Sequence, residues 1–198
     1  HILYESNTDK LFPASSFTKL LFALELSRRI DSGQISNAKI TITPDKLAGY
    51  GQDVPADLMG NQKAVSLDLH ALMRLMLKYS YNTATQIIAR DYLPPRKELQ
   101  KTAEKEWHLQ DIKLIDDEGD FANEIAMNTV KDLFIHIFEE NRTNIINALQ
   151  QNINTYTLFD MFPYTVLASK NAAFHDDAAD IHWLGRAGWS RGKMAGKH

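Results

Sequence analysis

The 198-residue sequence contains no cysteine. This absence excludes disulfide bonds, thiolate metal ligands and a cysteine nucleophile, although it does not indicate a cellular compartment. The sequence also has no excess of positive charge, because it contains 22 Lys and Arg residues and 25 Asp and Glu residues. The sequence therefore offers no bulk basic field for nucleic acid, and nucleic acid is not an expected partner.

Long apolar runs are missing as well. None approaches the roughly 18 residues that a membrane span needs, and no signal peptide is visible. The chain opens at His1-Ile2-Leu3-Tyr4 as if within a strand, so an export signal could have been removed upstream. The 44% hydrophobic content is enough for a core, and no linker divides the chain. We therefore expect one domain spanning residues 1–198.

Strand-like segments stand at the two ends of the chain, and helical patterns fill its middle. The expected strands are residues 1–8, 164–170 and 179–184, and the helical lobe covers about 44–160. The first helix should run from Ser16 to near Gly33, and a later one should be capped by Ser66. The glycines at 185, 188, 192 and 196 do not resemble a closing strand. A sheet from both chain ends with helices packed on it, an α/β fold, is the simplest arrangement.

The first motif that indicates chemistry is Ser16-Phe17-Thr18-Lys19. The Ser-x-x-Lys pattern also begins at Ser36 and Ser190, but only Ser16 begins a strongly apolar helix. Residues three apart share a helix face, so the Lys19 amine can reach the Ser16 hydroxyl. A partly desolvated, neutral Lys19 near the helix N-terminus could act as the base for Ser16. The alternative is a capping serine beside a lysine that extends to solvent.

The second motif, Ser80-Tyr81-Asn82, lies between two expected helices, where side chains can point into a cleft. The Ser80 hydroxyl could pass a proton to a leaving nitrogen. The Asn82 amide could bind a substrate carbonyl and also hydrogen-bond Lys19. The alternative is that Ser80 or Asn82 simply caps the following helix.

Residues 12–20 and 72–85, which contain these motifs, resemble class A β-lactamases and penicillin-binding proteins. That family combines Ser-x-x-Lys with Ser-Asp-Asn and Lys-Thr-Gly. The resemblance implies an antiparallel sheet built from both chain ends, with an inserted helical lobe. It also implies that Ser16 is the nucleophile of an acyl-enzyme and Lys19 its base or proton shuttle. Ser80 would pass the proton to the leaving nitrogen, and Asn82 would bind the substrate's amide side chain.

The third motif of the family corresponds to Lys170-Asn171-Ala172-Ala173. By this resemblance Lys170 would attract a substrate carboxylate, and Asn171 could donate to it. The backbone N–H groups of Ser16 and Ala173 would form the oxyanion hole. The family usually has Thr or Ser and then Gly after the lysine. Ala172 therefore adds a methyl group that could narrow the cleft.

Release of the acyl group needs a further residue in class A β-lactamases, a Glu on an extra loop that activates water. No convincing counterpart stands between Trp107 and Thr129. Glu118 and Glu124 are candidates by location, but acidic residues in a turn are usually only solvated. Without such a base the acyl-enzyme would form and persist, as in a penicillin-binding protein or a slow peptidase.

Two other kinds of site, for a metal and for a nucleotide, have weaker support in the sequence. His175 and His182 stand near aspartates but show no metal-ligand spacing, so no metal is expected. Gly49-Tyr50-Gly51 is too short for a nucleotide fingerprint. By resemblance, Tyr50 would instead line the rim of the substrate cleft.

The resemblance thus implies a cofactor-free serine hydrolase outside the cytoplasmic membrane. Its partner would be a small-molecule β-lactam or a peptidoglycan stem peptide. The alternative is a family member with a decayed site, acting as a peptidoglycan-binding or regulatory module. The sequence does not indicate an oligomeric state.

Overall fold

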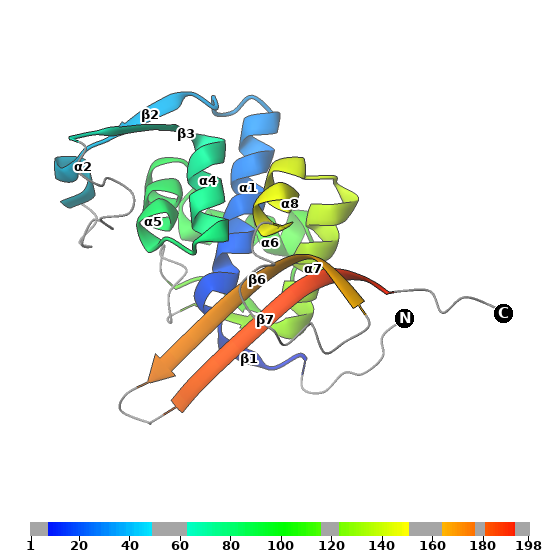
Figure 1. The fold of residues 1–198 in the computed structure, drawn as a ribbon. Coiled ribbons are helices and arrows are strands. Elements are labelled where there is room, and N and C mark those ends of the chain that lie inside the picture. The colour runs from blue at the N-terminus through cyan, green and yellow to red at the C-terminus, as the bar shows by residue number, and fades with distance from the viewer. Residues whose placement is uncertain (1–7, 49–62, 116–122, 151–163, 177–180, 193–198) are drawn as a thin grey trace.

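A computed structural model describes residues 8–48, 63–115, 123–150, 164–176 and 181–192 (Figure 1). Its centre is one long helix, α1 (Thr18–Asp31), which follows the short 3-10 helix η1 (Ser15–Phe17). α1 contacts α4, α5, α7 and α8, so these four helices are packed around it. The expected helix from Ser16 to near Gly33 is confirmed, with a first turn of 3-10 form.

The apolar composition of α1 explains why it lies at the centre of the fold. Every side chain from Thr18 to Ser27 is buried, because this segment is apolar on nearly all sides. The segment also buries two ionisable side chains, Lys19 at 1% exposed and Glu25 at 0%. The Glu25 carboxylate accepts two hydrogen bonds of 2.8 Å from Arg28 and lies 3.8 Å from Arg29. The hydrogen bond to Glu25 raises the pKa of Arg28, so the guanidinium stays charged and keeps the buried carboxylate paired.

The other described helices lie between residues 44 and 150, within the range expected for the helical lobe. Their bounds are α2 (Pro44–Ala48), α4 (Leu69–Lys78), α5 (Asn82–Asp91), α6 (Arg96–Glu106), α7 (Met127–Glu139) and α8 (Thr143–Gln150). The predicted cap of α4 is wrong. Ser66 lies in a strand, and the Asp68 carboxylate accepts the hydrogen bond from the Ala71 N–H at 2.7 Å. The Asp side chain caps well because it satisfies one of the four unpaired N–H groups of the first turn.

Two small antiparallel sheets flank the helices. In the first, β5 (Glu124–Ala126) lies between β1 (Leu11–Pro13) and β4 (Ile112–Lys113). In the second, β2 (Lys39–Ile42) pairs with β3 (Val65–Asp68). The sequence analysis did not predict β1 or β5, because three residues are too few to show a period of two.

A long hairpin completes the described part of the chain. β6 (Tyr164–Asp176) pairs with β7 (Ile181–Gly192), and β6 contacts η1 and α8 while β7 contacts α7 (Figure 1). Both strands are longer than predicted, and the prediction that Gly185, Gly188 and Gly192 lie outside a closing strand is wrong. All three glycines have partners in β6, and the register shifts once, between Val166 and Ala168, as glycine-containing strands often do at a bulge.

The first expected strand, residues 1–8, lies almost wholly outside the described residues, so its pairing with the hairpin stays a prediction. The same holds for the single-domain boundaries. Among the helices described, none combines the length and the apolar character required to cross a membrane.

Candidate active site

Lys19 is the centre of a compact group of polar side chains. It lies in the first turn of α1 and is only 1% exposed. Its Nζ lies 3.1 Å from Ser16 Oγ, as the spacing of three residues predicts. No side chain caps η1, so Ser16 is not the capping serine of the alternative hypothesis. Its hydroxyl instead contacts the residues that follow α4.

Ser80 approaches from the turn between α4 and α5. Its Oγ lies 2.6 Å from Ser16 Oγ and 3.1 Å from Lys19 Nζ. Lys19 Nζ also donates to the Ser80 backbone oxygen at 2.9 Å. Ser80 has a φ of +59°, in the left-handed region, which costs a non-glycine residue roughly 1 kcal/mol. Such strain persists where surrounding contacts enforce it, and here those contacts come from Ser16 and Lys19.

Asn82 completes the group from the first turn of α5. Its Oδ1 accepts a hydrogen bond of 2.6 Å from Lys19 Nζ. The N-cap position of α5 is Tyr81, with no side-chain cap bond, so neither Ser80 nor Asn82 has the capping role of the alternative hypothesis. Two segments that are distant in sequence therefore meet at one amine.

The geometry suits proton transfer. Four neutral oxygens surround Lys19 Nζ, from Ser16 Oγ, Ser80 Oγ, the Ser80 carbonyl and Asn82 Oδ1. An ammonium has three N–H donors, while a neutral amine donates two and accepts one from a hydroxyl. The short contact between the two hydroxyls adds a second link. A proton can thus move among Ser16, Lys19 and Ser80 without a large motion of any side chain.

Asn123 positions the segment that leads to Ser16, and the sequence analysis missed it. It is 0% exposed, and its backbone oxygen accepts from the Ala14 N–H at 2.6 Å. Its Oδ1 accepts from the Ile115 N–H at 2.6 Å, and its Nδ2 lies 3.5 Å from Thr18 Oγ1. A single Asn after an acidic stretch carries no periodic signal, so only the fold shows this role.

The third motif lies on β6, the strand that runs beside η1. Within the hairpin, Lys170 is paired with Ala187 and Ala173 with Leu184. Asn171 is paired with Arg186, a cation that the sequence analysis did not consider. The strand that carries the third motif therefore contacts the 3-10 helix that contains Ser16, and the roles of Lys170, Asn171 and Ala173 stay predictions.

The remaining predicted positions are not part of the described group. Tyr50 and Glu118 lie outside the described residues. Glu124 lies on β5, and its carboxylate is 3.2 Å from Lys113 Nζ, where both side chains are exposed to solvent. The β6–β7 hairpin pairs the backbones of His175 and His182, but two positions are fewer than a protein metal site uses. Within the described ranges, no three His, Asp or Glu residues are grouped closely enough to hold a metal ion.

Several solved structures have a fold similar to that of this chain. A β-lactamase from Chitinophaga pinensis DSM 2588 superposes with a TM-score of 0.77 at 16% identity, over 92% of this chain and 73% of that chain. A class A β-lactamase from Bacteroides cellulosilyticus DSM 14838 gives 0.75 at 17% identity, over 93% and 72%. The L158E mutant of PBP-A, as an acyl-enzyme complex with penicillin G, gives 0.72 at 21%, over 94% and 70%.

These likenesses confirm the expected β-lactamase-like α/β fold, with helices and antiparallel sheets. No curated protein matches the sequence. The sequence itself matches the model of the beta-lactamase enzyme family over residues 3–180, which is most of the chain. On that match, the chain belongs to the beta-lactamase enzyme family.

Proposed function

We propose that this chain is a serine acyl-transfer domain that acts on β-lactams or on D-Ala-D-Ala-type amides. The observation that carries the proposal is the contact of Lys19 Nζ with Ser16, Ser80 and Asn82. A nucleophile, a base within hydrogen-bond reach and a group that orients the base are the parts that covalent catalysis needs.

The first step forms a tetrahedral adduct on Ser16, which becomes an ester when the carbon–nitrogen bond breaks in the second step. Ser16 Oγ attacks the carbonyl carbon, and its proton passes to Lys19 Nζ at 3.1 Å, directly or through Ser80 Oγ at 2.6 Å. The carbonyl oxygen becomes an oxyanion, which the backbone N–H groups of Ser16 and Ala173 stabilise. β6 lies beside η1, which supports this pairing of donors.

The second step breaks the carbon–nitrogen bond. The leaving nitrogen takes a proton from Ser80 Oγ, which recovers one from Lys19 at 3.1 Å. The proton taken from Ser16 thus ends on the leaving amine, and the amine of Lys19 returns to its starting state. Asn82 holds Lys19 and binds the substrate amide, while Lys170 and Asn171 attract the substrate carboxylate.

Deacylation is the slow step of the proposal. Glu124 is paired with Lys113 at 3.2 Å, which leaves Glu118 as the candidate base by position. An acidic residue of that segment is a weak candidate, so the acyl group should remain on Ser16. A similar fold, that of the PBP-A L158E mutant, was captured as an acyl-enzyme with penicillin G, and this supports a stable ester on this scaffold. The proposed substrates are β-lactams and peptidoglycan amides, and this supports a location outside the cytoplasmic membrane.

A second candidate function is a family member without catalysis that binds peptidoglycan or regulates another protein. Lys170-Asn171-Ala172 favours it, because Ala172 replaces the usual glycine where a substrate approaches the strand.

Intact-protein mass spectrometry over a time course with benzylpenicillin tests the proposal. The protein should gain a penicilloyl adduct that persists, and Ser16→Ala should gain none. Ser36→Ala is the matched control, because Ser36 begins a second Ser-x-x-Lys pattern and is exposed. No adduct and no ring-opened product would contradict the proposal and favour the second function. Ring-opened product without a lasting adduct would contradict slow deacylation, and Glu118→Gln would then show whether Glu118 is the base.

A further inference from the structure

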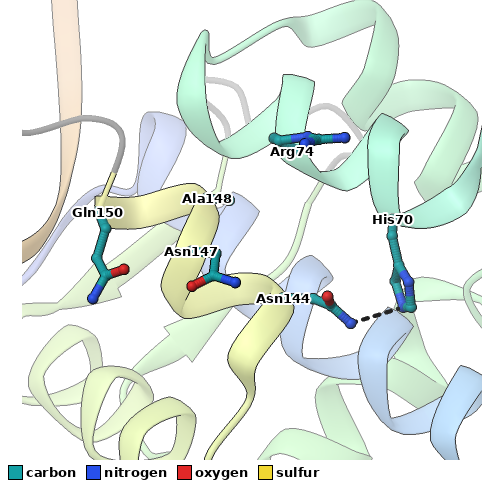
Figure 2. Close-up of a pocket in the computed structure, with 6 residues that line it drawn as sticks. All are labelled: His70, Arg74, Asn144, Asn147, Ala148 and Gln150. Atoms are coloured by element: carbon teal, nitrogen blue, oxygen red, sulfur yellow. Dashed lines mark hydrogen bonds between the residues drawn. The ribbon is translucent and has the colours of Figure 1, made fainter.

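A polar pocket lies between α4 and α8, separate from the Lys19 group. Its volume is about 370 Å³, within the range of small-molecule sites. Figure 2 shows three carboxamides along α8, with His70 and Arg74 on the neighbouring α4. The lining residues are His70, Arg74, Asn144, Asn147, Ala148 and Gln150.

Arg74 gives this pocket its charge. Its side chain is exposed, and among the described residues it forms no ion pair and no hydrogen bond. Of the described side chains that line the pocket, none is acidic. A guanidinium presents its donors as a planar fork that fits the two oxygens of a carboxylate. The pocket therefore favours an anion with planar oxygens.

His70 orients one carboxamide of the pocket, and its own orientation is fixed from outside the pocket. Asn37 Oδ1 accepts from the His70 backbone N–H at 3.1 Å, which turns Asn37 Nδ2 toward His70 Nδ1 at 3.0 Å. Because Asn37 Nδ2 is a donor, His70 Nδ1 accepts, and the ring N–H is on Nε2. Nε2 lies 3.3 Å from Asn144 Nδ2, on the pocket side (Figure 2). The Asn144 amide therefore has to turn its Oδ1 toward Nε2 to accept this N–H, which leaves its NH2 group for the pocket.

The carboxamides define the rest of the ligand. Asn147 and Gln150 follow Asn144 along α8, and both are exposed at the pocket (Figure 2). An amide side chain both donates and accepts, so it matches hydroxyl and amide groups equally well. We propose that this pocket binds a small carboxylate that also carries hydroxyl or amide groups, with the carboxylate on Arg74 and the neutral polar groups on α8.

The pocket and the Lys19 group have no described residue in common, because the lining includes none of Ser16, Lys19, Ser80 and Asn82. Arg74 lies about 6 Å of helix before Lys78, the last residue of α4, and Ser80 follows two residues after Lys78. The pocket is therefore a second site, and its ligand need not touch Ser16. The inference does not depend on acylation of Ser16, so the two proposals can fail separately.

Two sugars that differ by one group provide the test. N-acetylmuramic acid carries a carboxylate that N-acetylglucosamine lacks, and acetyl-D-alanine presents a carboxylate without hydroxyls. Each is titrated into the full chain and followed by isothermal calorimetry and by protein NMR. N-acetylmuramic acid should bind, with shifts at His70 and α8, and N-acetylglucosamine should bind at least tenfold more weakly. Acetyl-D-alanine decides whether a peptide carboxylate is also accepted, and its binding to Arg74 would equally support the site.

Substitutions inside and outside the pocket show whether the ligand binds there. Arg74→Gln should weaken it at least tenfold, and Asn147→Leu severalfold, because both side chains are exposed and their loss leaves the core intact. Lys97→Gln removes an exposed cation outside the pocket and should change nothing. Ser16→Ala should bind as the natural protein does. Equal binding of the two sugars, no binding of any carboxylate, or full binding by Arg74→Gln would overturn the inference.

Discussion

Lys19 Nζ donates to Asn82 Oδ1 at 2.6 Å, across a sequence separation of 63 residues. This bond joins the first turn of α1 to the first turn of α5 and fixes the amine beside both serine hydroxyls. Because Lys19 is 1% exposed, its contacts are decided by protein atoms and not by bulk water. In the proposed reaction, the properties of this one amine therefore decide whether Ser16 is activated.

Replacing Lys19 by Met keeps the aliphatic stem and removes the amine. Acylation of Ser16 should slow by roughly 10²–10⁴-fold, the usual contribution of a positioned general base. The second-order rate of adduct formation with benzylpenicillin measures the loss. Lys97→Met, at an exposed position of α6, is the matched control. Acylation of Lys19→Met at the natural rate would show that another group is the base.

Replacing Asn82 by Asp retains the acceptor and adds a charge. A carboxylate beside Lys19 favours the ammonium form, so less of the amine is available as a base. We expect acylation to fall by about tenfold or more, while the free energy of unfolding is unchanged or higher. Asn82→Leu should instead lower the free energy of unfolding by about 1–3 kcal/mol, because a buried donor loses its partner. Equal acylation rates for Asn82→Asp and the natural protein would argue against a neutral Lys19.

Replacing Asp68 by Ala tests the start of α4. The cap bond to the Ala71 N–H is lost, and the free energy of unfolding should fall by about 1 kcal/mol. Ser66→Ala is the control, since Ser66 is the cap that the sequence suggested and lies exposed in β3. Urea denaturation of both variants gives the comparison. A larger loss for Ser66→Ala would reverse the assignment.

The contrast between Ser66 and Asp68 illustrates what the sequence can predict. Apolar periodicity places α4 correctly, but two candidate caps stand two residues apart, and pairing of β3 with β2 decides between them. Ser16 and Lys19 are close because a helix fixes residues three apart, so that pair was predictable. Their contact with Ser80 depends on how α1 packs against α4 and α5, and only the family resemblance indicated it.

Other features had no local signal at all. β1 and β5 are three residues each and pair over a long sequence separation. Asn123 acts through hydrogen bonds from the backbone N–H groups of Ala14 and Ile115. The hairpin strand β7 continues through three glycines because its partner strand supplies the hydrogen bonds. In each case, the structure is decided by a distant part of the chain.

Replacing Ala172 by Gly tests whether the altered third motif limits the reaction. Removing the methyl group lets a substrate approach the β6 backbone more closely, so acylation should become severalfold faster. Ala187→Gly makes the same change on β7, at the partner position of Lys170, and should not accelerate acylation. Adduct formation followed by intact mass measures both. An unchanged rate in Ala172→Gly would show that this methyl group does not restrict the cleft.

The most direct test of the central claim is to locate the acyl group by tandem mass spectrometry. After reaction with benzylpenicillin, trypsin releases two separate peptides. Residues 11–19 contain Ser15 and Ser16, and residues 79–90 contain Ser80. Fragment ions of the first peptide distinguish its two serines. We expect the added mass on Ser16. Its presence on Ser15 or Ser80 would contradict the assignment of the nucleophile.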